Sequence, residues 1–522
     1  MRADLARRAL LGTSSDADAR GVRDAGDALV AASAPASAER HVLLAAGVRR
    51  VRERAGFVAS EAGSVPEACA AEELPECAAG AARLIDELAT GDGALFAFAL
   101  RRLATTRRHV PARLLPAVLD AVARARSRGH LSDAAAATVV GARGAWLARL
   151  ARGDWERALA GASDAARDDD ERVLAEGDRD ARMEVLSRRR RVTPDVVRTW
   201  LEPLLRTERA DERERLVSLL AIGLAPADEG FLEGVLDDRA VGVRRAAAQL
   251  LARLPESAYA RRIEERAAAL LTYTPPAAPS VWQRLRGSVP RAQLDVVPPP
   301  AELPPEWLRD GLGAPVPHGT GVRAARLREL LARVPPRRWC ERFGAEPAAL
   351  LAALGDSEWR AAVVDGLLDA LALAPDTEWT DALVSVARDD LALRRRAVAV
   401  APAAELPRRL AAALADGLAW SDAVTIARER GLDAWDDALS AAFIASLRRA
   451  AEVPAPDDAR ARTVSVAVGG VADAAVALAP RALVEAETWL TSLACGGALE
   501  RHRDDALARI RLCIRIHQEI RP

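Results

Sequence analysis

The sequence predicts an all-α protein in which paired helices stack into an α-solenoid. Half of its 522 residues are hydrophobic but only 4% are aromatic. Ala and Leu dominate the apolar residues, and together with abundant Arg and Glu and few β-branched runs they favour helix. No segment alternates apolar and polar residues for long enough to predict a strand. One pattern of Asp, Arg and apolar residues recurs at intervals in the low thirties, which is typical of solenoids with two helices per repeat.

The segment Phe231–Pro255 shows the repeat most clearly. Its first part carries an apolar stripe, Asp237 and Asp238 follow as an acidic turn, and a second stripe opens at Val243. Pro255 ends this second stripe because proline has no amide donor. We therefore expect two short amphipathic helices joined by a tight turn.

The register of this segment returns elsewhere in the chain. An Asp followed four residues later by Arg opens a helical stripe at Asp178 and again, thirty-three residues on, at Asp211. The same spacing occurs at Asp356 and, thirty-four residues on, at Asp390. Each recurrence predicts one helical pair.

Four regions are expected along the chain. They are an N-terminal helical region (1–152), a first group of repeats (153–273), a proline-rich connector (274–320) and a second group of repeats (321–522). Within the first region the helices are expected over Glu76–Thr90, Leu95–Thr105, Leu114–Ser127 and Ser132–Ala151. A long last helix, Ala498–Glu519, either caps the stack or docks a partner; capping is favoured because a solenoid must cover its exposed apolar end.

The connector is defined by its prolines. Eleven of the 30 prolines fall between Pro275 and Pro317, and prolines at this density exclude a long helix. The connector is either a free extended linker or an ordered strap along the stack. The apolar Trp282 and Trp307 favour the strap, because a free linker has no use for such anchors.

The spacing Asp-x4-Val-Arg-x2-Ala-x3-Leu in Asp238–Leu251 resembles a HEAT repeat. The resemblance extends over 178–255 and 354–400 and is absent from 1–150. In that family a turn Asp and a following Arg form a ladder of contacts between successive units. The resemblance implies that the ladder here consists of Asp178, Arg182, Asp211, Arg215, Asp238, Arg244, Asp356, Arg360, Asp390 and Arg394. An Asp at a helix N-terminus can also accept free amides, and an Arg can bridge to the neighbouring acidic turn.

The whole chain also resembles an uncharacterised family of GC-rich bacteria. The motifs that carry this resemblance are Arg7–Thr13, Gly141–Leu147 before Trp155, and Gly223–Pro255. The Asn-Pro pair expected before Trp155 is replaced by Gly153 and Asp154. Members are encoded beside SWIM zinc-finger proteins, MoxR-type ATPases and von Willebrand A proteins. The resemblance implies an accessory protein of a MoxR/von Willebrand A system and assigns no activity.

Charge and composition narrow the class of protein. All 74 basic residues are Arg, and they stand against 75 acidic residues, for a net charge of -1. Neither Lys nor Asn occurs, which points to a GC-rich, bacterial genome because their codons are AT-rich. The charge balance argues against a dedicated nucleic-acid binder. The first residues lack the apolar run of a signal peptide, no segment is apolar for long enough to span a membrane, and we expect a cytoplasmic protein.

The sequence contains no constellation typical of catalysis or cofactor binding. Its six histidines are isolated, whereas a helical metal site needs two ligands one turn apart, so no metal is expected. Gly91–Gly93 and Gly311–Gly313 lack the further Gly and the Lys of a phosphate loop and are expected to be turns. The five cysteines show no paired spacing. We therefore expect no cofactor and no enzymatic activity.

Two features could support nucleic-acid binding. Arg188, Arg189, Arg190 and Arg191 form the densest basic run, which would contact phosphates or, as favoured here, complement a helix C-terminus and meet nearby acids such as Asp178, Asp180 and Glu184. Trp339, Trp359 and Trp379 fall twenty residues apart, and Trp359 lies beside Arg360 and near Asp356, as in the damaged-base cleft of HEAT-like DNA glycosylases. The favoured interpretation is that these Trp fill gaps between Ala-rich helices.

The function predicted from the sequence is a non-enzymatic α-solenoid scaffold or adaptor that binds a protein partner, with a MoxR-type ATPase or von Willebrand A protein suggested by the resemblance. The alternative is a HEAT-like nucleic-acid-binding protein or DNA glycosylase that uses a basic groove with Trp and Asp. Such a protein would bind DNA in a salt-dependent manner.

Overall fold

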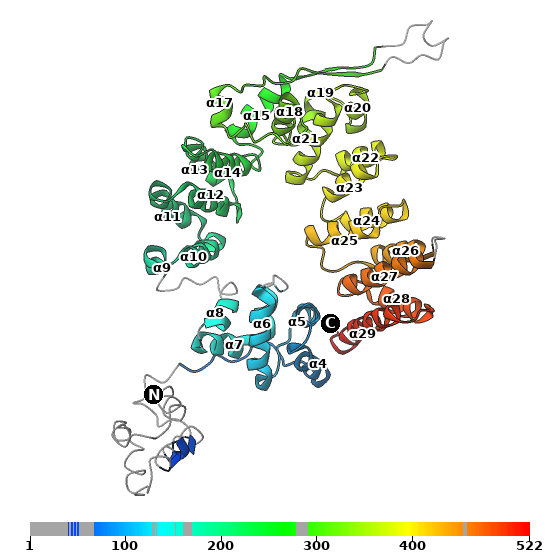
Figure 1. Ribbon diagram of the computed structural model, residues 1–522. Helices are drawn as coiled ribbons and strands as arrows, with labels where there is room; N and C mark the ends of the chain where they lie inside the picture. The colour runs from blue at the N-terminus through cyan, green and yellow to red at the C-terminus, as the bar shows by residue number, and fades with distance from the viewer. Residues whose placement is uncertain are drawn as a thin grey trace. The chain divides into compact units, whose positions relative to one another are not determined.

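The computed structural model describes residues 67–521 except 128–130, 132, 152, 160–169, 278–290 and 453–456, together with scattered positions between 40 and 51. The chain divides into two compact units, Met1–Cys69 and Ala70–Pro522. In the first unit the described residues between 40 and 51 are helical, and the motif Arg7–Thr13 lies outside the described residues. The second unit is built almost entirely of α-helices, as the sequence predicts (Figure 1).

Five helices open the second unit, and the first four lie close to the predicted ranges. They are α4 (Ala79–Ala89), α5 (Gly93–Thr105), α6 (Leu115–Ser127), α7 (Asp133–Ala151) and α8 (Gly153–Leu159). The carboxylate of Asp92 begins α5 by accepting the amides of Ala94 and Leu95 at 2.7 and 3.3 Å. Fully buried Leu84, Phe96 and similar residues of these helices form part of one apolar core.

Helix α7 is interrupted at Gly141, where the sequence predicts one continuous helix. Gly141 has a φ of +67°, in the left-handed region that favours glycine. The Glu72 carboxylate accepts the amides of Ala142 and Arg143 at 2.8 and 2.9 Å and so caps the second half of the helix. The break was not predictable from local pattern because its cap comes from 70 residues away. Ser132, the first residue of the predicted helix, lies outside the described residues.

The next helices include the pair predicted in Phe231–Pro255. They are α9 (Asp170–Glu176), α10 (Arg179–Val192), α11 (Pro194–Thr207), α12 (Ala210–Ser218), α13 (Glu229–Val235), α14 (Val241–Leu251) and α15 (Ala258–Ala268). Asp237 and Asp238 lie in the turn between α13 and α14. The apolar stripes of this pair are buried, with Leu236, Val243 and Leu251 all at 0% exposure.

Two short strands, which the sequence did not predict, stand on either side of the residues 278–290. Strand β1 (Leu271–Thr274) pairs antiparallel with β2 (Gln293–Val296), and Leu271 lies opposite Val296. Only Leu271 and Leu294 of these strands are buried. Each strand has only four residues, and this is too short for an alternation of apolar and polar residues to predict a strand from the sequence. Trp282, one of the two anchors expected for a strap, lies outside the described residues.

Residues 297–320 of the connector lie along the neighbouring helices. They include α17 (Pro305–Arg309), and Asp310 after it is 1% exposed. The Asp310 carboxylate accepts from Arg262 at 3.1 Å and from Arg266 at 2.8 Å, while its carbonyl oxygen accepts from the Tyr259 hydroxyl at 3.0 Å. At Gly311 a Cβ atom would lie 2.8 Å from Cβ of Ala248, so the close approach to α14 requires glycine.

The remaining helices continue to the end of the unit. They are α18 (Val322–Leu331), α19 (Arg337–Phe343), α20 (Pro347–Ala353), α21 (Arg360–Leu373), α22 (Thr377–Val386), α23 (Leu391–Ala399), α24 (Leu406–Ala415), α25 (Trp420–Glu429), α26 (Asp437–Glu452), α27 (Asp457–Ala474), α28 (Pro480–Ser492) and α29 (Ala498–Glu519). Among the described helices, none combines the length and apolarity that a membrane crossing requires.

Most helix contacts in this unit join neighbours along the chain. The most extensive contacts join helices two or three elements apart, such as α12 and α14, α18 and α21, α24 and α26, and α27 and α29. The buried apolar residues fall into two cores: one from residues 186–397, the other from 77–159 together with 398–520. The second of these cores therefore combines the beginning and the end of the unit.

The last helix packs against the first helices of the unit. Helix α29 contacts α4 as well as α27 and α28. The ring of His517 on α29 meets that of Phe98 on α5 edge to face, with centroids 5.4 Å apart. Arg102 Nε donates to the carbonyl oxygen of Ile520 at 2.8 Å. Burial, reinforced by the nearby positive charge of Arg102, lowers the pKa of His517 to about 4.

A buried ion pair joins α10 to the turn before α13. Arg190 and Asp228 are both 0% exposed, and the guanidinium donates to the carboxylate. Arg190 also donates to two backbone carbonyl oxygens, at 2.9 and 3.1 Å. Burial by itself would raise the pKa of Asp228, but hydrogen bonds from Arg190, from the Ala225 amide and from Arg198 outweigh it and hold the pKa below its ordinary value.

We expect Asp228→Ala to lower the free energy of unfolding by about 3–5 kcal/mol, because it leaves Arg190 buried without its counter-charge. Urea unfolding followed by circular dichroism measures the loss. Asp195→Ala is the matched control: Asp195 pairs with the same Arg198 but its side chain is 82% exposed, so its removal should cost less than about 1 kcal/mol. Equal losses in the two variants would contradict the role of the buried pair.

We expect protonation of His517 to destabilise the fold. Because its folded pKa lies below the unfolded value of 6.5, the unfolded chain binds the extra proton first, and stability falls as pH drops from about 6.5 towards 4. Allowing for solvent screening of a partly exposed ring, the loss is about 1–2 kcal/mol. Urea midpoints at pH 7.5 and 5 should therefore differ less in His517→Phe than in the parent chain. The exposed His502, changed to Gln, should leave the pH response as it was.

Candidate functional site

The aspartates of the predicted ladder that lie at helix starts accept backbone amides. Asp178 accepts from Ala181 at 2.8 Å, and Asp390 accepts from Leu393 at 2.9 Å. Asp238 accepts from the Ala240 amide at 2.7 Å. These carboxylates accept hydrogen bonds from amides near the helix starts that would otherwise lack a partner.

Three of the predicted ladder arginines donate to backbone carbonyls rather than to a carboxylate. Arg244 donates to the carbonyl oxygen of Asp238 at 2.7 Å, and Arg360 donates to that of Gly355 at 3.1 Å. Arg394 likewise donates to the carbonyl of Arg388. Each of these side chains therefore folds back and fixes the turn that precedes its own helix.

Of the other predicted ladder residues, all but Arg182 are more exposed. Arg182 contacts Glu208, which lies between α11 and α12, at 2.8 Å. Asp211 lies 3.7 Å from Arg179, and Arg215 lies 3.7 Å from Asp180, all with side chains about half exposed or more. Asp356 is exposed in the turn before α21.

Ion pairs between successive helical pairs are made largely by residues that were not predicted. Arg213 forms two hydrogen bonds with Asp238, at 2.9 and 2.8 Å, across 25 residues of sequence. Further examples are Arg262 with Glu233, Arg409 with Asp381, and Arg396 with Asp365, separated by 29, 28 and 31 residues. These ion pairs could have been predicted from the sequence by searching for an Arg and an acidic residue about one repeat apart. The search would also need to know which face of each helix points towards its neighbour.

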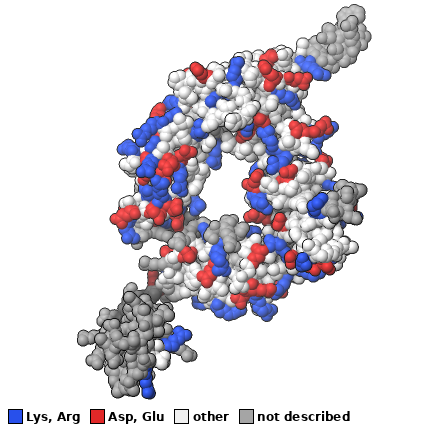
Figure 2. Space-filling view, in the orientation of Figure 1, with Lys and Arg blue, Asp and Glu red and all other residues white. Residues whose placement is uncertain are grey.

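The basic run at the end of α10 is engaged within the fold. Arg188 is 3% exposed and pairs with Asp170, which also accepts from Arg189 at 2.9 Å. Arg190 is paired with Asp228 as described above, and Arg191 is exposed. The acids that meet the run are thus Asp170 and Asp228, not Asp178, Asp180 and Glu184 as expected. Figure 2 shows basic and acidic side chains interspersed over the visible face.

Two of the three evenly spaced tryptophans belong to the core. Trp339 and Trp379 are each 2% exposed, and Trp339 stacks on Phe343 with ring centroids 5.9 Å apart. Trp359 is partly buried at the start of α21. Burial of two of these rings leaves them no surface on which a flipped base could stack.

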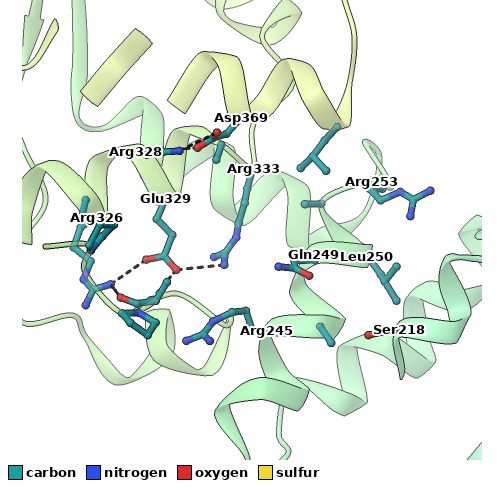
Figure 3. A pocket seen from close by; sticks show the side chains of 18 of the residues that line it. Ser218, Arg245, Gln249, Leu250, Arg253, Arg326, Arg328, Glu329, Arg333 and Asp369 are labelled. Atoms are coloured by element: carbon teal, nitrogen blue, oxygen red, sulfur yellow. Dashed lines mark hydrogen bonds and ion pairs between the residues drawn. The ribbon is translucent and has the colours of Figure 1, made fainter. Parts of the chain in front are cut away.

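A cavity of about 720 Å³ lies where α14, α18 and α21 meet residues 314–320 of the connector. We call it the arginine cavity, because five arginines line it. They are Arg245 and Arg253 from the α14 region and Arg326, Arg328 and Arg333 from α18 and its end. Figure 3 shows Arg245 reaching in from α14 while Arg326 and Arg333 reach in from the opposite wall. This site could not be predicted from any single stretch of sequence, because the residues that line it extend from Ser218 to Leu373.

Two carboxylates of the arginine cavity are already occupied. Asp369 accepts two hydrogen bonds from Arg328, at 2.6 and 3.1 Å. Glu329 accepts the amides of Gly313 and Ala314 at 2.9 and 3.0 Å and also contacts Arg326 and Arg333 (Figure 3). Glu329 thus fixes the connector on α18, and the remaining arginines keep an excess of positive charge.

The chemistry available at the arginine cavity is recognition of an anion. Ser218 and Thr320 supply hydroxyls, and Ser218 donates to the carbonyl oxygen of Glu214 at 2.8 Å.

Outside the arginine cavity, burial raises the pKa of the Cys340 thiol to about 11 and that of the Cys513 thiol to about 12, which keeps both thiols protonated. Within the described part of the chain, no cluster of His, Cys, Asp and Glu could hold a metal ion.

The comparisons with known proteins concern the whole chain. No curated protein and no solved structure matches it. A family model does match, over residues 4–521, and its description is a family of unknown function (DUF5691). This match includes the helices, the connector and the arginine cavity described above. The chain therefore belongs to the family of unknown function DUF5691.

Proposed function

We propose that this protein is an α-solenoid of HEAT-like helical pairs that acts as a non-enzymatic scaffold or adaptor for a protein partner. The observation that carries the proposal is the periodic joining of helical pairs by Arg–carboxylate contacts. Contacts such as Arg213–Asp238, Arg409–Asp381 and Arg396–Asp365 span 25 to 31 residues, close to the sequence period. Stacked repeats of this kind expose long surfaces that are suited to protein binding.

The distribution of charge supports a protein partner over a nucleic acid. A DNA-binding face needs a basic excess, whereas this chain has a net charge of -1. Arg188 and Arg190 are consumed by buried ion pairs, and Trp339 and Trp379 are core residues. The nucleic-acid alternative is therefore left with Arg191 and the partly buried Trp359 from the two features that motivated it.

The partner class rests on the resemblance of the chain to its bacterial relatives. We propose a MoxR-type ATPase or a von Willebrand A protein encoded nearby, acting with this adaptor in the bacterial cytoplasm. The division of the chain at 152, 273 and 320 belongs to the same proposal.

A binding experiment with purified components tests the proposed partner. The full chain should form a complex with the MoxR-type ATPase or the von Willebrand A protein of its own genome, with a Kd of about 10 µM or tighter, because repeat scaffolds bind over extended surfaces. Size-exclusion chromatography with light scattering measures it. A MoxR-type ATPase from a genome without this family is the control. If neither cognate protein binds, or if the control binds equally well, the proposed partner class is wrong.

A second experiment tests the nucleic-acid alternative. In 50 mM salt, fluorescence anisotropy with a 20-base-pair duplex should give a Kd no tighter than about 10⁻⁴ M, at the weak end of non-specific binding. Arg191→Glu, at the one exposed position of the run, should leave that value unchanged. Sub-micromolar binding that weakens steeply with salt and is lost in Arg191→Glu would restore the alternative.

A further inference from the structure

Three guanidinium donors at the arginine cavity have no hydrogen-bond acceptor among the described residues. They are Nε of Arg245, Nε of Arg326 and Nη1 of Arg333, and all three atoms are buried. Arg333 as a whole is only 8% exposed; its Nη2 donates to the carbonyl oxygen of Gly311 at 2.9 Å, which leaves Nη1 free. A buried charged donor without an acceptor is unfavourable, so each of these three arginines at the cavity wall keeps hydrogen-bonding capacity that no described residue meets.

The cavity also has a surplus of positive charge. Its carboxylates, Glu329 and Asp369, are saturated by the amides and arginines already described. Arg245 and Arg253 form no ion pair with any residue that the structure describes. An oxyanion entering the cavity would meet Arg245 and Arg253 without a competing carboxylate, and it would share Arg326 and Arg333 with Glu329.

The walls between the arginines are aliphatic. Ala246, Leu250 and Pro315 are typical of the described lining residues, none of which is aromatic. The volume of about 720 Å³ falls within the range of small-molecule sites. A nucleobase would find no ring to stack on, whereas an alkyl chain would be surrounded by apolar atoms.

We propose that the arginine cavity binds an aliphatic molecule that carries a carboxylate or phosphate group. The oxyanion accepts from Arg245, Arg326 and Arg333, and the alkyl part lies against the Ala, Leu and Pro walls. The site is independent of the proposed scaffold role, since it rests on the cavity alone. Because α14, α18 and the connector all line it, a bound ligand would join the two sides of the connector.

Isothermal titration calorimetry of the full chain tests the proposal with four probes: octyl phosphate, octanoate, inorganic phosphate and 1-octanol. Octyl phosphate or octanoate should bind with a Kd between about 10 µM and 1 mM, as expected for ligands of this size. Both inorganic phosphate and 1-octanol should bind at least about tenfold more weakly, because each lacks one half of the recognised group. The tighter of the two anions identifies the head group as phosphate or carboxylate.

Arg245→Gln is the decisive variant, because Arg245 has no ion pair whose loss would disturb the fold. It should weaken binding of the preferred anion by about tenfold or more and leave the thermal midpoint unchanged. Arg261→Gln, an exposed arginine on α15 outside the cavity, should bind like the parent chain. Failure of both anions to bind would show that water satisfies the buried donors and would overturn the proposal. So would unchanged affinity in Arg245→Gln, or equal affinity for 1-octanol and octanoate.

Discussion

Guanidinium groups that reach from one helical pair to the next hold the second unit in register. Arg213 forms an ion pair with Asp238, and Arg409 forms one with Asp381. Arg262 pairs with both Glu233 and Asp310. Apolar contact between Ala and Leu side chains is non-directional and by itself defines the relative position of two helices only loosely. An Arg–carboxylate hydrogen bond has a defined geometry and makes that position more specific.

Some buried arginines of this chain form sets of hydrogen bonds that a lysine could not form. Arg190 donates to a carboxylate and to two carbonyl oxygens at once while fully buried. A lysine has a single ammonium on a flexible stem, loses its proton more readily when buried, and lacks the planar fork. A composition in which every basic residue is Arg therefore suits buried ion pairs of this kind.

Periodicity predicts some of this structure and misses the rest for identifiable reasons. The α13–α14 pair follows from two apolar stripes and an acidic turn, because each signal is local. Sequence reasoning chose Arg215, whereas Arg213 is the arginine that pairs with Asp238, and two residues along a helix turn a side chain by about 200°. The break at Gly141 and the arginine cavity depend on residues far apart in sequence, such as Glu72 against Ala142 and Arg245 against Arg333. The local pattern of apolar and polar residues carries no information about such long-range contacts.

The contact between α29 and the first helices of the unit constrains how the protein can be made. Arg515 pairs with Glu87 across 428 residues, and Arg509 pairs with Asp92 across 417. A ribosome that adds about 5–20 residues per second needs about 20–80 s to cover that distance. During this time the face of α4 and α5 that will receive α29 has no partner, and the core that both ends share is incomplete. The start of the unit therefore completes its core only after the last helix has been synthesised.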